Sequence, residues 1–551
     1  MTYTPRFRPP LSDPADKGAK PPRYARRVEH AVVIETDVAV TMRDGVTIYC
    51  DIYRPETGLA APLIGWGPYG KHGHTRYSVN FPKAEVDDSK MSAYTAFEAP
   101  DPMFWVPKGY AVIYPDPRGT WYSEGRASYL SDQEAQDFFD LIEWAGTRDW
   151  SNGKVGLSGV SYLTSAQWRV AELNPPHLAA INPWEGWTDT YREVARHGGI
   201  PETSFWHYLP GRWGHSVTEV EDLRLETAER PLIDAFWDSK AARLDRIKTP
   251  AFICASWTDQ ALHTRGTLEG FKNINSAQKW LYVHGRKKWQ HYYKDSSLDL
   301  QRVFFDHFLL GKSTSISDWP KVRYEIRDAY YKGREHSARE WPIENTDYQS
   351  LYLGGSGLFV QPQPAATRAY SPIKGELLTF DHVFTADTDL VGHMALKLWV
   401  EIETGEDMDI FVAIQKLDQQ GKVVPFAFYA QYEDGPVALG WLRASHRELC
   451  ENTTEYQPVQ AHKHALPLTP GVPVEVDIEI WPSGTRFAQG EGVRLVIGGK
   501  DIYDYPQPGV YARHQDLTNK GRQKIWVGAD RPSRLLIPVI RPGPVTKPFD
   551  D

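Results

Sequence analysis

The sequence predicts an α/β domain that is interrupted by a mostly helical insertion and followed by an all-β domain. The first observation is a set of short apolar runs, such as 62–66 and 110–114, that are closed by Gly or Pro, as strands buried on both faces are. The second is that such runs alternate with helical patterns, which is typical of an α/β sheet. The third is the loss of helical patterns after about residue 348, where period-2 strands take over.

The chain begins with an arm and a hairpin. Residues 1–27 are rich in Pro and charge and show no period of 2 or 3.6, so we expect an N-terminal arm that is flexible or wraps the surface. Alternating apolar residues then flank Asp44-Gly45. This pattern is typical of a β-hairpin.

The α/β domain is expected over 28–182 and 247–347. Ser131 and Glu134 form an S-x-x-E capping box ahead of a helical pattern. A strand over 154–157 and a helix over 165–172 follow. The buried-strand pattern returns at 251–255, so the same sheet is expected to resume there.

Two further segments complete the predicted architecture. Residues 183–246 are aromatic-rich and are expected to form a helical cap over the sheet. Residues 348–551 contain short strands spaced by Gly and Pro turns, which predicts a β-sandwich or jelly roll. The aromatic residues that we expect to line a substrate pocket are Trp184, Trp187, Phe205 and Trp206.

Composition excludes several classes of protein. The 551 residues include 41% hydrophobic and 24% charged residues, which is typical of a folded protein and not of a disordered one. The net charge is −9 and no basic block is present, so a nucleic-acid partner is not expected. No run reaches the roughly 20 apolar residues of a membrane span, and no secretory signal is recognisable. We therefore expect a cytoplasmic protein without a membrane partner, and the sequence leaves open whether it forms a homo-oligomer.

Ser161 is the candidate nucleophile. It lies in Gly159-Val160-Ser161-Tyr162, between a predicted strand and a predicted helix, where an α/β-hydrolase carries its nucleophile elbow. The fifth position of the motif is Leu163 instead of Gly, so the tripeptide alone also fits a structural turn. Ser158 has a Gly at the same spacing, but it falls at the end of the strand.

Four ordered motifs identify a family. They are DPRGTWYSEG (116–125), GLSGVSYL (156–163), NPPHLAAINPWEG (174–186) and GWLRASHRE (440–448). Together they resemble the family of cocaine esterase and the X-Pro dipeptidyl-peptidases of the S15 type. The resemblance implies an α/β-hydrolase domain with a helical cap insertion, followed by a C-terminal jelly-roll domain.

The resemblance also implies a Ser-Asp-His triad, for which the matching residues are Ser161, Asp259 and His291. Without the family, Asp259 also fits a turn or a helix cap. The family usually shows G-P-W-x-H after the last strand, whereas this chain reads Gly285-Arg-Lys-Lys-Trp-Gln-His291, two residues longer. His284, at the strand end, is the alternative base.

The oxyanion hole is expected from Tyr69 and Tyr162. Tyr69 resembles the family's Pro-Tyr, whose hydroxyl supplies one donor, and the main-chain N–H of Tyr162 would supply the other. A phenol suits this role because it donates a hydrogen bond without titrating near neutral pH. The alternative for Tyr69 is a structural turn that packs on the sheet.

A serine hydrolase that cleaves carboxylic esters is the expected function, with a small-molecule ester or amide as the partner. The alternatives are an X-Pro dipeptidyl-peptidase or amidase, and a non-catalytic glycan-binding protein. A peptidase needs a carboxylate for the substrate ammonium, and the candidates are Asp189, Glu193 and Glu202. No cofactor or metal is expected, because His72 with His74, and His462 with His464, each lack a third ligand in the sequence.

Overall fold

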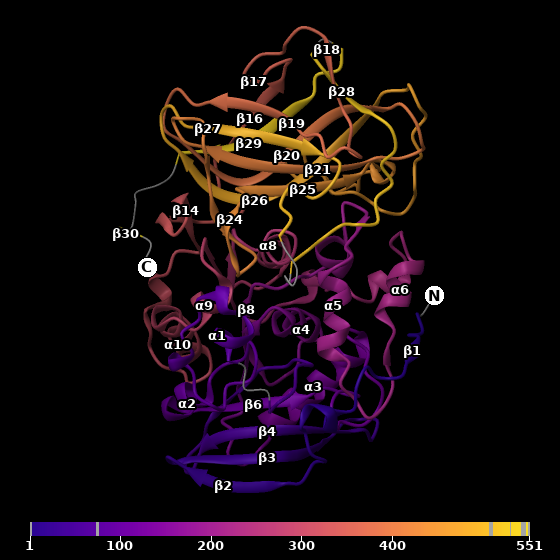
Figure 1. Ribbon diagram of the computed structural model, residues 1–551. Coiled ribbons are helices and arrows are strands. Elements are labelled where there is room, and N and C mark those ends of the chain that lie inside the picture. The colour runs from indigo at the N-terminus through magenta and orange to yellow at the C-terminus, as the bar shows by residue number, and fades with distance from the viewer. Residues whose placement is uncertain (1–2, 73–75, 506–510, 529, 542–546, 549–551) are drawn as a thin grey trace.

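The computed structural model describes residues 3–72, 76–505, 511–528, 530–541 and 547–548. Figure 1 shows an α/β domain below and an all-β domain above it, with the N-terminus beside the α/β domain. The expected fold class, an α/β domain with an insertion and a C-terminal all-β domain, is confirmed.

A mixed sheet forms the centre of the α/β domain. Its order is β2-β3-β4-β6-β5-β7-β8-β12-β13-β14-β15, and the pairs from β6 to β14 are parallel. The strands are β2 (Ala25–Glu29), β3 (Val32–Thr41), β4 (Thr47–Pro55), β5 (Ala61–Ile64), β6 (Tyr110–Asp116), β7 (Val155–Val160), β8 (Leu178–Trp184), β12 (Ala251–Ser256), β13 (Lys279–His284), β14 (Val322–Ala329) and β15 (Lys332–Ala338). The central strands are buried on both faces, which explains their continuous apolar runs.

Helices pack beside this sheet. They include α3 (Asp132–Gly146), α4 (Tyr162–Ala171), α8 (Thr264–Asn273), α9 (Lys288–Tyr292) and α10 (Asp295–Phe308). The Ser131 side chain caps α3 by accepting a hydrogen bond from the Glu134 N–H at 3.1 Å. The Glu134 carboxylate turns into the core and accepts hydrogen bonds from Trp66 and Tyr162, which anchors α3 against the first turn of α4.

The segment between β8 and β12 contains helices and short strands. It holds a π-helical turn (Tyr191–Ala195), β9 (Arg196–His197), β10 (Ile200–Pro201), α5 (Phe205–Trp213), β11 (Val220–Glu221), α6 (Leu223–Glu229) and α7 (Ala235–Asp238). The N-terminal arm runs along this segment, because β1 (Phe7–Arg8) pairs with β11 and Arg6 forms an ion pair with Glu226. The arm is therefore attached to the insertion by a strand pair and an ion pair.

The C-terminal domain is an antiparallel sandwich with its own apolar core. In one layer β16, β29, β20 and β26 are neighbours, and β28 joins β20 to β18. In the other, β19, β27, β21 and β25 are neighbours. The strands are β16 (Asp347–Leu353), β18 (Ala366–Tyr370), β19 (Leu378–Val383), β20 (Thr388–Ile402), β21 (Asp409–Leu417), β25 (Ala438–Arg443), β26 (Val474–Phe487), β27 (Gly492–Gly498), β28 (Gln523–Val527) and β29 (Arg534–Ile540).

Within the described part of the chain, no helix is both long and apolar enough to cross a membrane.

Candidate active site

Ser161 lies at a sharp turn between β7 and α4. Its backbone has φ 61° and ψ −116°, a strained conformation that a non-Gly residue adopts only where its surroundings impose it. The Ser161 N–H supplies that constraint by donating to the carbonyl oxygens of Trp184 and Glu185 at 3.1 and 3.0 Å. The turn therefore presents the hydroxyl at the end of the strand, as a nucleophile elbow does.

Gly159 explains why the elbow tolerates Leu163 at its fifth position. Gly159 has φ 147°, and a Cβ there would lie 2.5 Å from Leu163 Cδ2. Gly67 meets the same side chain at 2.6 Å. Leu163 thus fills space that two glycines leave free.

Ser158 lies in a different environment from Ser161. It is inside β7, and its hydroxyl lies 3.0 Å from the Tyr292 hydroxyl and 3.4 Å from Asn182 Oδ1. Its exposed fraction is 1%, and it does not line the pocket that contains Ser161. Ser158 is therefore a residue of the core.

His263 is hydrogen-bonded to both Ser161 and Asp259. The Ser161 hydroxyl donates to His263 Nε2 at 3.2 Å, and His263 Nδ1 donates to Asp259 Oδ2. A carboxylate on Nδ1 selects the tautomer that leaves Nε2 free to accept a proton. The three side chains therefore have the connectivity of a nucleophile, a base and an orienting acid.

The local fold explains why His263 reaches this place. Asp259 follows β12, and its carbonyl accepts hydrogen bonds from the N–H groups of His263 and Thr264 at the start of α8. Side chains four residues apart lie on one face of a helical turn, which brings the imidazole onto the carboxylate. Trp187 stacks on the imidazole at 5.7 Å between ring centroids, with 7° between the planes.

His291 is not at this position, which corrects the placement expected from the sequence. It lies on α9 with its ring centroid 4.0 Å from that of His284 and 6.0 Å from that of Trp184. His284 Nε2 in turn lies 3.1 Å from Glu185 Oε1. Both histidines therefore belong to a buried layer beneath the elbow, because α9 begins directly after the loop and turns His291 back against the sheet.

Lys288 adds a cation to the Asp259–His263 pair. Its Nζ donates to Asp259 Oδ2 at 2.8 Å and lies 3.2 Å from His263 Nδ1. Since Nδ1 carries the proton donated to Asp259, the ammonium has only the carboxylate as acceptor here. The Asp259 carboxylate is thus held by two donors.

The electrostatics of the site keep His263 neutral. Burial, followed by the Lys288 ammonium, lowers the pKa of His263 to about 4, although Asp259 opposes this shift. The Lys288 and His263 side chains hold the pKa of Asp259 below its ordinary value despite its burial. At neutral pH the imidazole is therefore an unprotonated base beside an ionised carboxylate.

We expect Lys288→Met to move the acidic limb of the kcat/KM profile to higher pH. Only neutral His263 can accept the Ser161 proton, so activity falls as pH drops through the His263 pKa. Removing a cation that lowers this pKa should raise it, by about one pH unit or more. The measurement is kcat/KM of an ester from pH 4 to 9, and an unchanged acidic limb would contradict this role of Lys288.

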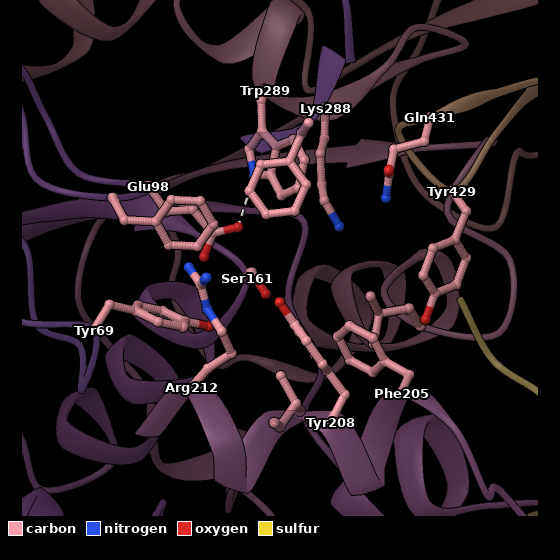
Figure 2. A pocket seen from close by; sticks show the side chains of 14 residues that line it. Tyr69, Glu98, Ser161, Phe205, Tyr208, Arg212, Lys288, Trp289, Tyr429 and Gln431 are labelled. Carbon is pink, nitrogen blue, oxygen red and sulfur yellow. Dashed lines mark hydrogen bonds between the residues drawn. The ribbon is translucent and has the colours of Figure 1, made fainter. Parts of the chain in front are cut away.

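Ser161 opens into a mostly apolar pocket (Figure 2). Aromatic rings from both domains surround it, and the charged side chains on its wall are Glu98, Arg212 and Lys288. Lining residues are Tyr69, Phe81, Phe97, Glu98, Ser161, Phe205, Tyr208, Leu209, Arg212, Leu262, Lys288, Trp289, Tyr429 and Gln431.

Only Phe205 of the four expected pocket aromatics lines this pocket. Trp184 and Trp206 are buried, and their indole N–H groups donate to Asn182 and Thr227. Trp187 is buried against His263. Aromatic density in the insertion therefore corresponds largely to core packing, which corrects the placement of these three residues.

The two residues expected to form the oxyanion hole lie close together, with their ring centroids 6.3 Å apart. Tyr69 follows β5, lines the pocket with Ser161 and extends into it in Figure 2. Burial raises the pKa of Tyr69 well above its ordinary value, so its hydroxyl stays a donor. Tyr162 is the first residue of α4, where the main-chain N–H has no acceptor within the helix. Its phenol instead donates to Glu134 in the core.

We expect Tyr69→Phe to lower kcat about 100-fold if the hydroxyl stabilises an oxyanion, because one donor is lost in the transition state. Steady-state kinetics on one ester, with thermal unfolding as a check on the fold, measure this effect. An unchanged kcat would make Tyr69 a packing residue of the pocket wall.

One described cluster has the side chains of a metal site. Ligand atoms of Asp37, Asp51 and His72 lie within 4.8 Å of one another. However, Lys71 Nζ donates to Asp37 at 2.6 Å and lies 3.6 Å from Asp51. The ammonium already supplies the cation, so the cluster fits an ion-pair network better than a metal site. His74 lies outside the described residues.

The second histidine pair is split between two environments. His462 is buried, with its Nδ1 2.9 Å from His446 Nδ1. His464 is more exposed, and its Nδ1 lies 2.9 Å from Glu448. The two side chains therefore do not share a ligand position.

Comparison with known proteins identifies the family. The family model described as X-Pro dipeptidyl-peptidase (S15 family) matches residues 44–293, and the model of the X-Pro dipeptidyl-peptidase C-terminal non-catalytic domain matches 315–536. A crystal structure of a CocE/NonD family hydrolase from Staphylococcus aureus is 40% identical, with a TM-score of 0.91, and the match covers 95% of this chain and 98% of that one. The chain belongs to the CocE/NonD family of hydrolases.

Two less similar relatives carry different names. Cocaine esterase from Rhodococcus sp. is 23% identical over 92% of this chain and 99% of its own length. A putative Xaa-Pro dipeptidyl-peptidase from Bacillus anthracis is 25% identical over 40% of this chain and 41% of its own. The CocE/NonD chain described here is thus an enzyme, a serine hydrolase, and the resemblance seen in its motifs is confirmed.

Proposed function

We propose that the chain hydrolyses carboxylic esters through an acyl-enzyme, with Ser161 as nucleophile, His263 as base and Asp259 as orienting acid. The observation that carries this proposal is the hydrogen-bonded series from the Ser161 hydroxyl through His263 to Asp259, at the wall of a mostly apolar pocket. Such a series activates a hydroxyl that is otherwise a poor nucleophile.

The reaction has two steps. Ser161 Oγ attacks the ester carbonyl while its proton passes to His263 Nε2, and Tyr69 with the Tyr162 N–H donates to the oxyanion. The tetrahedral intermediate expels the alcohol, which takes the proton from His263, and leaves an acyl-Ser161. A water molecule then gives a proton to His263 and attacks the acyl carbonyl. The acyl–Oγ bond breaks as His263 returns this proton to Ser161 Oγ, which releases the acid and restores both side chains.

The three carboxylates that the sequence offers for binding a peptide ammonium have other partners. Asp189 forms an ion pair with Arg192 at 2.6 Å, and Glu193 with Arg265 at 2.7 Å. Glu202 accepts three hydrogen bonds from main-chain N–H groups at the start of α5. A dipeptide ammonium therefore finds no free charge at these positions, which favours ester hydrolysis over dipeptidyl-peptidase activity.

We expect neutral aryl or short-chain acyl esters to be hydrolysed with kcat/KM at least about tenfold above that of Gly-Pro or Ala-Pro anilides. The apolar pocket gains from burying hydrocarbon, at roughly 25 cal/mol per Å², and esters have the better leaving group. Both series are measured on one preparation. Glu98 is the acidic side chain among the residues that line the described pocket, so it is the carboxyl that a substrate ammonium could reach. If the anilides are preferred and Glu98→Gln abolishes that preference, the dipeptidyl-peptidase alternative replaces ester hydrolysis.

A further inference from the structure

Arg212 brings a cation to the pocket wall without a partner of its own. It lies on α5, and Figure 2 shows its guanidinium on the same side of the pocket as Glu98 and Tyr69. Among the described residues, no side chain or carbonyl forms an ion pair or hydrogen bond with it, and its guanidinium carbon lies 5.6 Å from the centre of the Phe97 ring. A guanidinium beside apolar rings binds an anion more strongly than one in water.

Glu98 is held beside the elbow in a strained conformation. Its φ is 62°, its carbonyl accepts from the Val160 N–H at 3.0 Å, and its own N–H donates to the Tyr77 hydroxyl at 3.0 Å. These bonds tie Glu98 to the residue that precedes Ser161. Strain of this kind is retained where the surrounding structure imposes it, often at functional sites.

One oxygen of the Glu98 carboxyl lacks a partner. Oε1 accepts from the Trp289 indole at 2.7 Å, whereas no described group hydrogen-bonds to Oε2, although the residue is only 1% exposed. Burial raises the pKa of Glu98 to about 8, against the opposing effects of Lys288, Trp289 and Arg212. At neutral pH the group is mainly a carboxylic acid, with a proton to donate.

The charges of the pocket then do not balance. The Lys288 ammonium is neutralised by the Asp259 carboxylate, which it contacts directly. Glu98 is the only acidic side chain that lines the described pocket, and it is mainly uncharged. Arg212 therefore leaves one uncompensated positive charge near the nucleophile.

We propose that Arg212 and Glu98 form a subsite for a carboxylate on the substrate, so that the preferred substrates are short esters that carry a carboxylate. This inference rests on the proposed ester hydrolysis at Ser161. The guanidinium supplies charge and paired N–H donors, and the Glu98 acid supplies a further donor to the same anion. Arg212 and Glu98 line the same cavity as Ser161, which favours a short chain between the ester and the carboxylate.

Two matched pairs of esters test the subsite. Monoethyl glutarate and ethyl pentanoate differ in that a carboxylate replaces a methyl group on the acyl side. 3-Acetoxypropanoate and propyl acetate differ in the same way on the alcohol side. For at least one pair we expect the anionic ester to have kcat/KM about tenfold or more above the neutral one, because hydrogen bonds to a charged carboxylate are stronger than contacts with a methyl group.

Variants separate recognition from structure. Arg212→Met should reduce the anionic-to-neutral ratio of kcat/KM to about one, mainly through KM, and Arg212→Lys should retain part of it. The matched control is Arg224→Met, since Arg224 is exposed on α6 and donates to the His207 carbonyl; it should leave the ratio unchanged. A merely structural role of Arg212 would lower both rates together and preserve the ratio.

The outcomes also separate this inference from the proposed function. Hydrolysis of the neutral esters without any anionic preference would overturn the subsite alone. If no ester were hydrolysed, ester hydrolysis would fail, and the subsite would still be tested by calorimetry of glutarate with the Ser161→Ala protein. There we expect Arg212→Met to weaken binding at least about tenfold; equal binding by both proteins would overturn the subsite.

Discussion

Replacing His263 with Gln should lower kcat by about 1,000-fold or more, whereas His291→Gln should leave kcat within about threefold of the unsubstituted protein. His263 is the imidazole that contacts the Ser161 hydroxyl, and it is oriented by Asp259. Gln cannot accept and return a proton at that position, so the loss falls on the chemical steps. His291 lies against His284 instead.

The same substitution at both histidines controls for the effect of replacing a buried imidazole. Both histidines are buried, and Gln keeps a polar side chain at each position. Thermal unfolding of the two variants shows whether either has lost its fold. If His291→Gln lost activity to that extent while His263→Gln stayed active, the base expected from the family motif would be the true one.

Ser161→Ala should abolish ester turnover, with a loss of about 10,000-fold or more in kcat, and leave the fold intact. The hydroxyl is the only atom group removed, and no described core hydrogen bond depends on it apart from that to His263. Ser158→Ala should keep measurable activity, because Ser158 contacts Tyr292 and Asn182 within the core.

Equal losses in both serine variants would overturn the assignment of Ser161. The pair is informative because the two residues lie three positions apart and each follows a Gly by two residues. Kinetics with one activated ester, together with calorimetric unfolding, distinguish lost chemistry from lost stability.

Much of the fold could be predicted from local patterns. The hairpin around Asp44-Gly45 appears as β3 and β4, and the Ser131 cap begins α3. Parallel strands that are buried on both faces can be recognised in the sequence as short apolar runs. The all-β domain was visible in period-2 alternation. Element ends were less certain: β7 extends to Val160, three residues past its expected end, because pairing with β8 continues up to the elbow.

The site was only partly predictable. Ser161 and Asp259 each follow a buried strand, which a sequence pattern can reveal. The base could not be chosen in this way, since His263, His284 and His291 all keep the order Ser, Asp, His. The spacing of four residues between Asp259 and His263, at the start of a helix, was the one available signal.

Tertiary contacts decide the rest of the pocket. More than a hundred residues of chain separate Glu98 from Arg212, and about seventy separate Arg212 from Lys288. All three nevertheless line one cavity with Ser161. Nothing in their local sequence marks them as neighbours. Their contacts depend on how the insertion, α9 and the loop before β6 pack against one another in the folded chain.

The most direct test of the Ser161–His263–Asp259 assignment is the rate of labelling by a fluorophosphonate probe, followed by peptide mass spectrometry. We expect the label on Ser161, at similar rates in the unsubstituted protein and in His291→Gln, and at least about 100-fold more slowly in His263→Gln, because the base activates the hydroxyl. Absence of label would support a non-catalytic protein. Label on Ser158, or slow labelling in His291→Gln with normal labelling in His263→Gln, would contradict the assignment.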